Sequence, residues 1–129
     1  MDTSLKGQTL FELTRVVDRG KLEELAEAID SPTAAETATL VPFFGPSLRG
    51  ETFVRDRLAI DTSRALLAGI SYQWHRPFEI GEVVDVRLFV EDIYEKAGTQ
   101  FAVVSTEFRD TAGALIQQQR ATFIERGAR

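Results

Sequence analysis

Apolar and polar residues alternate along the second half of the chain in the pattern that predicts extended strands. Between residues 84 and 90, valine and leucine occupy every second position and mostly charged residues stand between them, so one face of this strand is apolar. The loops at residues 96–98 and 110–113 contain glycine and have hairpin length, and Gly81-Glu82 forms an earlier turn. The pattern predicts a meander of antiparallel strands over residues 68–78, 84–91, 101–109 and 115–126.

The first half of the chain predicts one strand and two helices. Residues 9–17 are rich in branched and aromatic side chains and predict a first strand at an edge of the sheet. Asp18 offers a helix cap, and apolar residues recur on one helical face over residues 19–29. Residues 33–65 are apolar but interrupted by proline and glycine, and a short buried helix fits near residues 46–58.

Together these elements predict an α+β fold. The length of 129 residues suits one hydrophobic core rather than two. Because the predicted strands have one apolar face, a helix must cover that face. We expect a single domain over residues 1–129.

Charge and composition exclude several classes of function. The formal net charge of −5 argues against a protein that binds nucleic acid through phosphate neutralisation. The absence of cysteine and the single histidine exclude thiol nucleophiles and a multi-histidine metal site within one chain, so carboxylates remain the main acid–base candidates. The first residues lack the apolar core of a secretory signal, and no apolar run approaches the roughly 20 residues that cross a bilayer. We expect a cytoplasmic protein that does not contact membranes.

One segment carries a resemblance to a known family. Tyr72-Gln-Trp-His-Arg-Pro-Phe78, followed by Gly81-Glu82, resembles the aromatic strand, His-Arg-Pro element and acidic turn of FAS1-like or MaoC-like N-terminal dehydratase domains. The resemblance covers most of the chain and is patchy over residues 33–59. Other segments that resemble the family in order and spacing are residues 19–32, 60–64, 90–94, 98 and 110–115.

The resemblance implies a hot-dog fold, in which an antiparallel sheet wraps around a central helix. It also implies a second hot-dog unit as partner, in the same chain or in another as a homo- or heterodimer. The pantetheine arm of coenzyme A or of acyl carrier protein would be bound between the two units. The implied reaction is the reversible hydration of a 2-enoyl thioester, in which an Asp and a His share one water. No cofactor other than the thioester carrier is implied.

The loop that carries this Asp–His pair in catalytic members departs from the family pattern. The family loop is Asp-x-Asn-Pro-x-His after the first helix, whereas residues 29–34 here are Ile-Asp-Ser-Pro-Thr-Ala. Asp30 and Pro32 are retained, and the Asn and the His are missing. The chain therefore resembles the noncatalytic, substrate-binding half of a heteromeric dehydratase, and we expect its partner to carry the pair.

Polar candidates for the site are few. Asp30 is a weak candidate for positioning water, and we favour its alternative role as a turn residue. His75 and Arg76 would contact a phosphate or the thioester carbonyl, although His75 also suits an exposed strand end. Four arginines would attract coenzyme A phosphates, but scattered surface positions are the commoner case: Arg49, Arg55, Arg57 and Arg64.

Aromatic and amide side chains complete the candidate set. Tyr72, Trp74 and Phe78 fall on alternate positions and would line an acyl tunnel or fill the core, and we favour the core for Tyr72 and Phe78. Residues 117–120, Gln-Gln-Gln-Arg, place polar groups on both faces of the last strand. We interpret this run as a partner interface, with a solvated edge as the alternative.

Two other functions stay open beside the leading hypothesis of a substrate-binding subunit. A hot-dog thioesterase would need a carboxylate such as Asp30, Asp61 or Glu36 to direct water at the thioester carbonyl. A nonenzymatic acyl-thioester binding module would show affinity without turnover.

Overall fold

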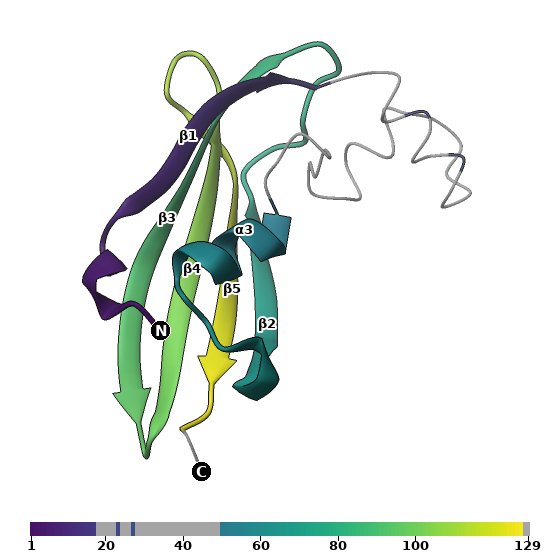
Figure 1. Ribbon diagram of the computed structural model, residues 1–129. Coiled ribbons are helices and arrows are strands. Elements are labelled where there is room, and N and C mark those ends of the chain that lie inside the picture. Colours follow the sequence, from purple (N-terminus) through teal and green to yellow (C-terminus); the bar gives the residue numbers. More distant parts are fainter. Residues whose placement is uncertain (18–22, 24–26, 28–49, 128–129) are drawn as a thin grey trace.

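The structure is a computed structural model that describes residues 1–17, 23, 27 and 50–127 (Figure 1). The predicted helix over residues 19–29 lies outside the described residues except for Glu23 and Glu27, which are helical. The short helix expected near residues 46–58 is present. The described elements are η1 (Thr3–Leu5), β1 (Thr9–Val16), α3 (Gly50–Arg57), η2 (Thr62–Arg64), β2 (Ala65–Trp74), β3 (Val83–Lys96), β4 (Thr99–Arg109) and β5 (Leu115–Glu125).

The five strands form one antiparallel sheet in the order β1-β3-β4-β5-β2. The hairpins that join β3 to β4 and β4 to β5 confirm the prediction for the second half of the chain, and β1 lies at an edge as expected. The prediction that all four later strands follow one another was wrong for β2. This strand pairs with β5 at the opposite edge, so the chain crosses the end of the sheet between β2 and β3.

The crossover has a local cause in residues 75–82. β2 ends at Trp74, earlier than predicted, and the next backbone amide, that of His75, still donates to the carbonyl of Ile116 at 2.8 Å. Pro77 then offers no amide hydrogen for further pairing. Gly81 turns the chain at a φ of 85° and donates to the carbonyl of Val17 at 2.8 Å, which places the start of β3 beside β1.

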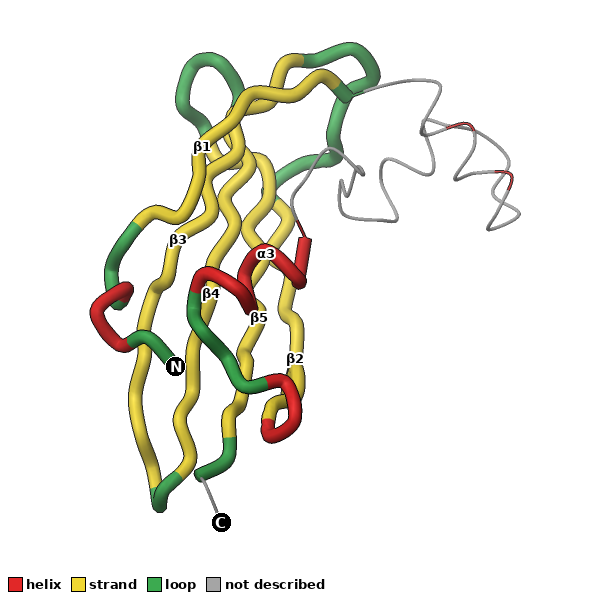
Figure 2. The backbone as a smooth tube through the Cα atoms, in the orientation of Figure 1, coloured by secondary structure: helices red, strands yellow, loops and turns green. Residues whose placement is uncertain are grey.

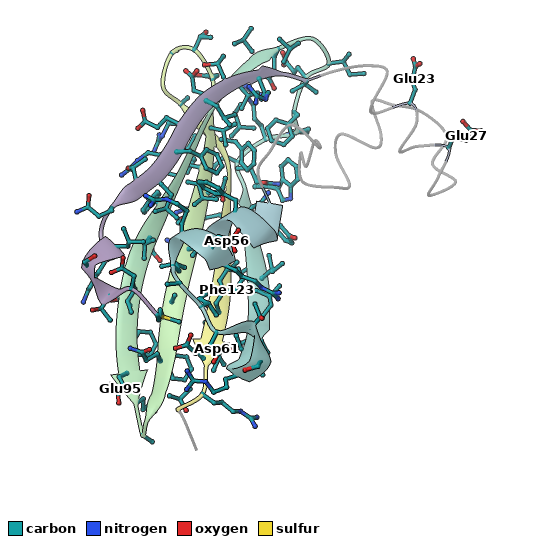
Figure 3. The ribbon with its side chains drawn as sticks, viewed as in Figure 1. Glu23, Glu27, Asp56, Asp61, Glu95 and Phe123 are labelled. Atoms are coloured by element: carbon teal, nitrogen blue, oxygen red, sulfur yellow. The ribbon has the colours of Figure 1, made fainter. Side chains whose placement is uncertain are left out.

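α3 lies against one face of the sheet, which we call the inner face (Figure 2). Val54 and Leu58 of this segment pack into a buried cluster with apolar residues of β3, β4 and β5, among them Phe123, which is labelled in Figure 3. In the described residues the covering helix is therefore α3, which is only eight residues long. An antiparallel sheet curved around a helix is the hot-dog arrangement, and the expectation of an α+β hot-dog fold is confirmed.

The apolar residues of the inner face form two buried clusters. One lies under α3, and the other lies at the end of the sheet where β1 and the crossover meet. Phe11 packs against both clusters. The second cluster contains Val17, Phe78, Val84, Val86, Phe108 and Ile116.

A buried carboxylate holds the opposite end of the sheet together. Glu125, at the end of β5, is 5% exposed. It accepts hydrogen bonds from the backbone amide of Asp61 at 2.7 Å and from the Met1 ammonium group at 3.1 Å. These bonds tie the η2 turn and the start of the chain to β5. No helix in the part of the chain that the structure describes is long and apolar enough to cross a membrane.

Candidate functional site

Aromatic residues of β2 lie at the inner face, next to the open edge of the sheet. Trp74 is half-buried and meets the ring of Phe78 edge-on, with centroids 5.4 Å apart. Phe78 in turn meets Phe108 at 5.6 Å. The prediction that Phe78 shares a strand with Tyr72 was wrong, because β2 ends at Trp74. Phe78 fills the core as expected, whereas Tyr72 is 43% exposed and does not.

Two buried glutamines lie beside these aromatic residues, and we call them the amide pair. Gln117 is fully buried and stands opposite Trp74, while Gln119 is 7% exposed and stands opposite Tyr72. The Nε2 group of Gln119 donates to Oε1 of Gln117 at 2.8 Å. The Nε2 group of Gln117 is buried and has no hydrogen-bond partner among the described residues. Such an unpaired buried donor is uncommon and calls for an explanation.

The other two residues of the polar run face the outer side of the sheet. Gln118 donates to Oγ of Ser105 at 2.8 Å, and Arg120 pairs with Glu91 at 3.0 Å. Arg120 is exposed, as expected for a residue on a solvated strand. The exposed Arg120 agrees with the predicted partner interface or solvated edge, whereas the amide pair is buried at the inner face, because alternate residues of a strand point to opposite faces.

His75 and Arg76 follow β2 and lie on the crossover. His75 is exposed. The guanidinium of Arg76 donates to both carboxylate oxygens of Glu82, at 3.0 and 2.8 Å, and lies 3.9 Å from Asp110. Its hydrogen bonds hold the pKa of Glu82 below the usual range, and the same contact raises the pKa of Arg76. The charge of Arg76 is thus largely compensated within the chain.

The bond between Arg76 and Glu82 predicts a pH-dependent contribution to stability. A carboxylate whose pKa is lowered by folding stabilises the folded state above its unfolded pKa, and this stabilisation is lost as the pH falls through the folded pKa. At pH 7 we expect Glu82→Gln to lower the free energy of unfolding by about 1 kcal/mol. The difference from wild type should shrink as the pH falls below about 4.3, the ordinary glutamate value.

Urea unfolding at a series of pH values measures this difference. Glu95→Gln is the control, because Glu95 is exposed at the far end of β3 (Figure 3). A difference between wild type and Glu82→Gln that stayed constant between neutral and acid pH would contradict the assignment.

The carboxylates considered for water activation do not form a site in the described residues. Asp61 accepts bonds from the amide and hydroxyl of Ser63 and from Nε of Arg64, and these bonds lower its pKa to about 2. So low a pKa makes Asp61 a poor general base. Asp30 and Glu36 lie outside the described residues, as does Arg49. Within those residues no cluster of three or more acidic or histidine side chains is placed to hold a metal ion.

The edge formed by β2 is apolar and carries several exposed side chains. Its sequence, Ala-Leu-Leu-Ala-Gly-Ile-Ser-Tyr-Gln-Trp, contains no charged residue. Leu66, Ile70 and Tyr72 are each more than 40% exposed, and β5 is the only described strand paired with β2. Edge strands usually carry charges or proline that prevent pairing with another sheet. β2 lacks both and is suited to accept a further strand.

The sheet order and the covering helix define a hot-dog protein. The chain belongs to the family of the FAS1-like dehydratase domain region, whose model matches residues 34–119. A relative from Thermobifida fusca (strain YX), named UPF0336 protein, is 27% identical over an alignment of 133 positions, and the match covers 91% of this chain and 85% of the relative.

Solved structures share the fold at low sequence identity. A MaoC-like dehydratase superposes with a TM-score of 0.71 at 18% identity, and the match covers 97% of this chain and 43% of that chain. The present chain thus spans less than half the length of that protein. The C-terminally truncated HadBC (3R-hydroxyacyl-ACP dehydratase) complex from Mycobacterium tuberculosis gives a TM-score of 0.61 at 15% identity, covering 96% of this chain and 99% of the matched chain.

Proposed function

We propose that this chain is the substrate-binding, noncatalytic subunit of a heteromeric 2-enoyl-CoA hydratase or 3-hydroxyacyl thioester dehydratase. The substrate is an acyl thioester of coenzyme A or acyl carrier protein, and no resident cofactor takes part. The observation that carries the proposal is the combination of Tyr72, Trp74 and the amide pair beside an uncharged open edge. These groups bind and position a ligand, but they provide no acid–base pair.

The missing acid–base chemistry points to a partner. Hydration needs one group to activate water and a proton donor at the neighbouring carbon. The loop at residues 29–34 lacks the Asn and His of the catalytic pattern, and the chain has a single histidine. That residue, His75, is exposed beyond the end of β2. A second subunit must therefore supply the pair.

The open β2 edge is where we place that second subunit. Adding the edge strand of another hot-dog sheet would bind the backbone groups of β2 that face away from β5, and it would cover the exposed side chains of Leu66, Ile70 and Tyr72. The same strand carries Trp74, so a ligand held near the amide pair would lie close to the joint between the subunits. The name of the HadBC structure, a dehydratase complex, supports an arrangement of two different chains.

The test compares the purified chain alone with the chain mixed with a hot-dog subunit that has the Asp-x-Asn-Pro-x-His loop. We expect binding of the two chains and hydration of crotonyl-CoA by the mixture, measured as loss of the absorbance of the conjugated thioester. The chain alone should give no hydration. Full activity of the isolated chain, or failure to bind any such subunit, would contradict the proposal. Release of free thiol from acyl-CoA by the chain alone would instead favour a thioesterase.

A further inference from the structure

The inner face of the sheet has a polar region between its two apolar clusters. Strand pairing places Thr106 beside Gln119, and Phe108 beside Gln117. Leu88 and Val86 of β3 continue these two rows toward β1. The amide pair thus stands on the side of the hydrophobic interior that adjoins the β2 edge. A position of this kind would be filled at lower cost by leucine if stability were its only role.

The amide pair has an excess of hydrogen-bond donors. Each glutamine amide has two N–H groups and a single carbonyl oxygen. The described contact uses one N–H of Gln119 and the oxygen of Gln117. The Nε2 group of Gln117 remains without an acceptor among the described residues although the side chain is fully buried. A group that satisfies this pair must contribute an acceptor, and a carbonyl oxygen is the neutral acceptor that fits an apolar setting.

We propose that Gln117 and Gln119 donate hydrogen bonds to a carbonyl oxygen of the bound acyl thioester. This inference rests on the proposed function, because it takes an acyl thioester as the ligand. Two parts of such a ligand have the required chemistry, the thioester carbonyl and the amide carbonyls of the pantetheine arm. Trp74 and Tyr72, the cross-strand neighbours of the pair on β2, supply apolar surface on the side of the open edge.

The main variant is the double substitution Gln117→Leu with Gln119→Leu. Replacing both partners of a buried hydrogen bond by apolar groups of similar size is close to neutral for stability, or favourable. We expect an unchanged or raised melting temperature together with about a tenfold loss of affinity for octanoyl-CoA, as loss of a hydrogen bond to a ligand predicts. If the amide pair had only a structural role, the affinity would not fall while the melting temperature stayed unchanged or rose.

Gln118→Leu is the matched control. Gln118 lies on the same strand between the two residues, points to the outer face, and also loses a hydrogen bond, the one to Ser105. We expect it to leave the affinity for octanoyl-CoA unchanged. Gln119→Leu alone is the second variant should the double variant fail to fold.

Titration calorimetry with two ligands distinguishes the sources of the carbonyl. S-octyl-CoA is a thioether that lacks the thioester carbonyl but keeps the pantetheine amides. If the pair binds the thioester carbonyl, the double variant loses affinity for octanoyl-CoA and binds S-octyl-CoA as wild type does. If the pair binds a pantetheine amide, the variant loses affinity for both ligands.

The titrations are done with the chain alone and with its catalytic hot-dog partner. Equal affinity of wild type and double variant for both ligands, or an equal loss in Gln118→Leu, would overturn the role of the amide pair and leave the proposed function standing. Failure of wild type to bind either ligand in both preparations would contradict the proposed function itself, and the role of the amide pair with it.

Discussion

Replacing Ile70 by lysine should weaken the binding of this chain to its hot-dog partner by about 100-fold and abolish hydration of crotonyl-CoA by the mixture. Ile70 lies in the middle of β2 and is 46% exposed, so the substitution costs little in the folded chain. In the complex the lysine would place a charge beside an added strand, where its desolvation opposes pairing. Analytical ultracentrifugation of the mixture measures the binding.

The chain offers a matched control at its other edge. Val16, on β1, is 53% exposed and has a similar branched side chain. Val16→Lys should leave both partner binding and hydration at wild-type levels. If it weakened binding as much as Ile70→Lys, or if Ile70→Lys had no effect, the partner would not dock on β2.

Replacing Phe108 by alanine should lower the free energy of unfolding by about 3–5 kcal/mol. The Phe108 side chain is fully buried near the end of β4 and meets the ring of Phe78 edge-on at 5.6 Å. Its removal leaves a cavity between β3, β5 and the crossover, where Val86 and Ile116 lose their contacts. Chemical denaturation of the purified variant measures the change.

Phe101→Ala is the control for this prediction. Phe101 is on the same strand, but it is half-buried on the outer face, where its ring stacks on Tyr94 at 4.8 Å. We expect a loss of less than about 2 kcal/mol, because water already reaches this site and no closed cavity forms. Equal losses in the two variants would mean that the cluster around Phe108 is not the tightly packed core that its burial indicates.

The three consecutive strands β3, β4 and β5 were predictable because the alternation of apolar residues and the glycine-containing turns indicate the same strand boundaries. Valine and leucine at every second position define the inner face of β3. The loops between these strands contain Gly98 and Gly113, which adopt φ values of 79° and 89° that few other residues tolerate. Because such loops are short, the strands that they join pair with each other as antiparallel neighbours.

The neighbour of β2 could not be predicted in the same way. Alternation reports which face of a strand is buried, but it does not report which strand lies beside it. Residues 75–82 have turn-forming chemistry that suits both a hairpin and a crossover. The decisive contact, from Gly81 to the carbonyl of Val17, joins residues that are far apart in the sequence.

The amide pair was misplaced for a different reason. Glutamine is mostly a surface residue, so a run of three predicts contact with water or with a partner. The alternation of side chains nevertheless requires that some members of the run point inward. A polar residue at position 117, beside the buried Phe108 of the neighbouring strand β4, is the feature that marks an internal polar site.

The two edges of the sheet differ in a way that limits how many chains assemble. β2 has no charged residue, whereas β1 presents Glu12 and Arg15 along the opposite edge. Once a partner sheet joins this one at β2, the free end on this side of the combined sheet is β1, whose charges resist further addition. We therefore expect growth by this route to stop at a closed pair, without progression to an open filament.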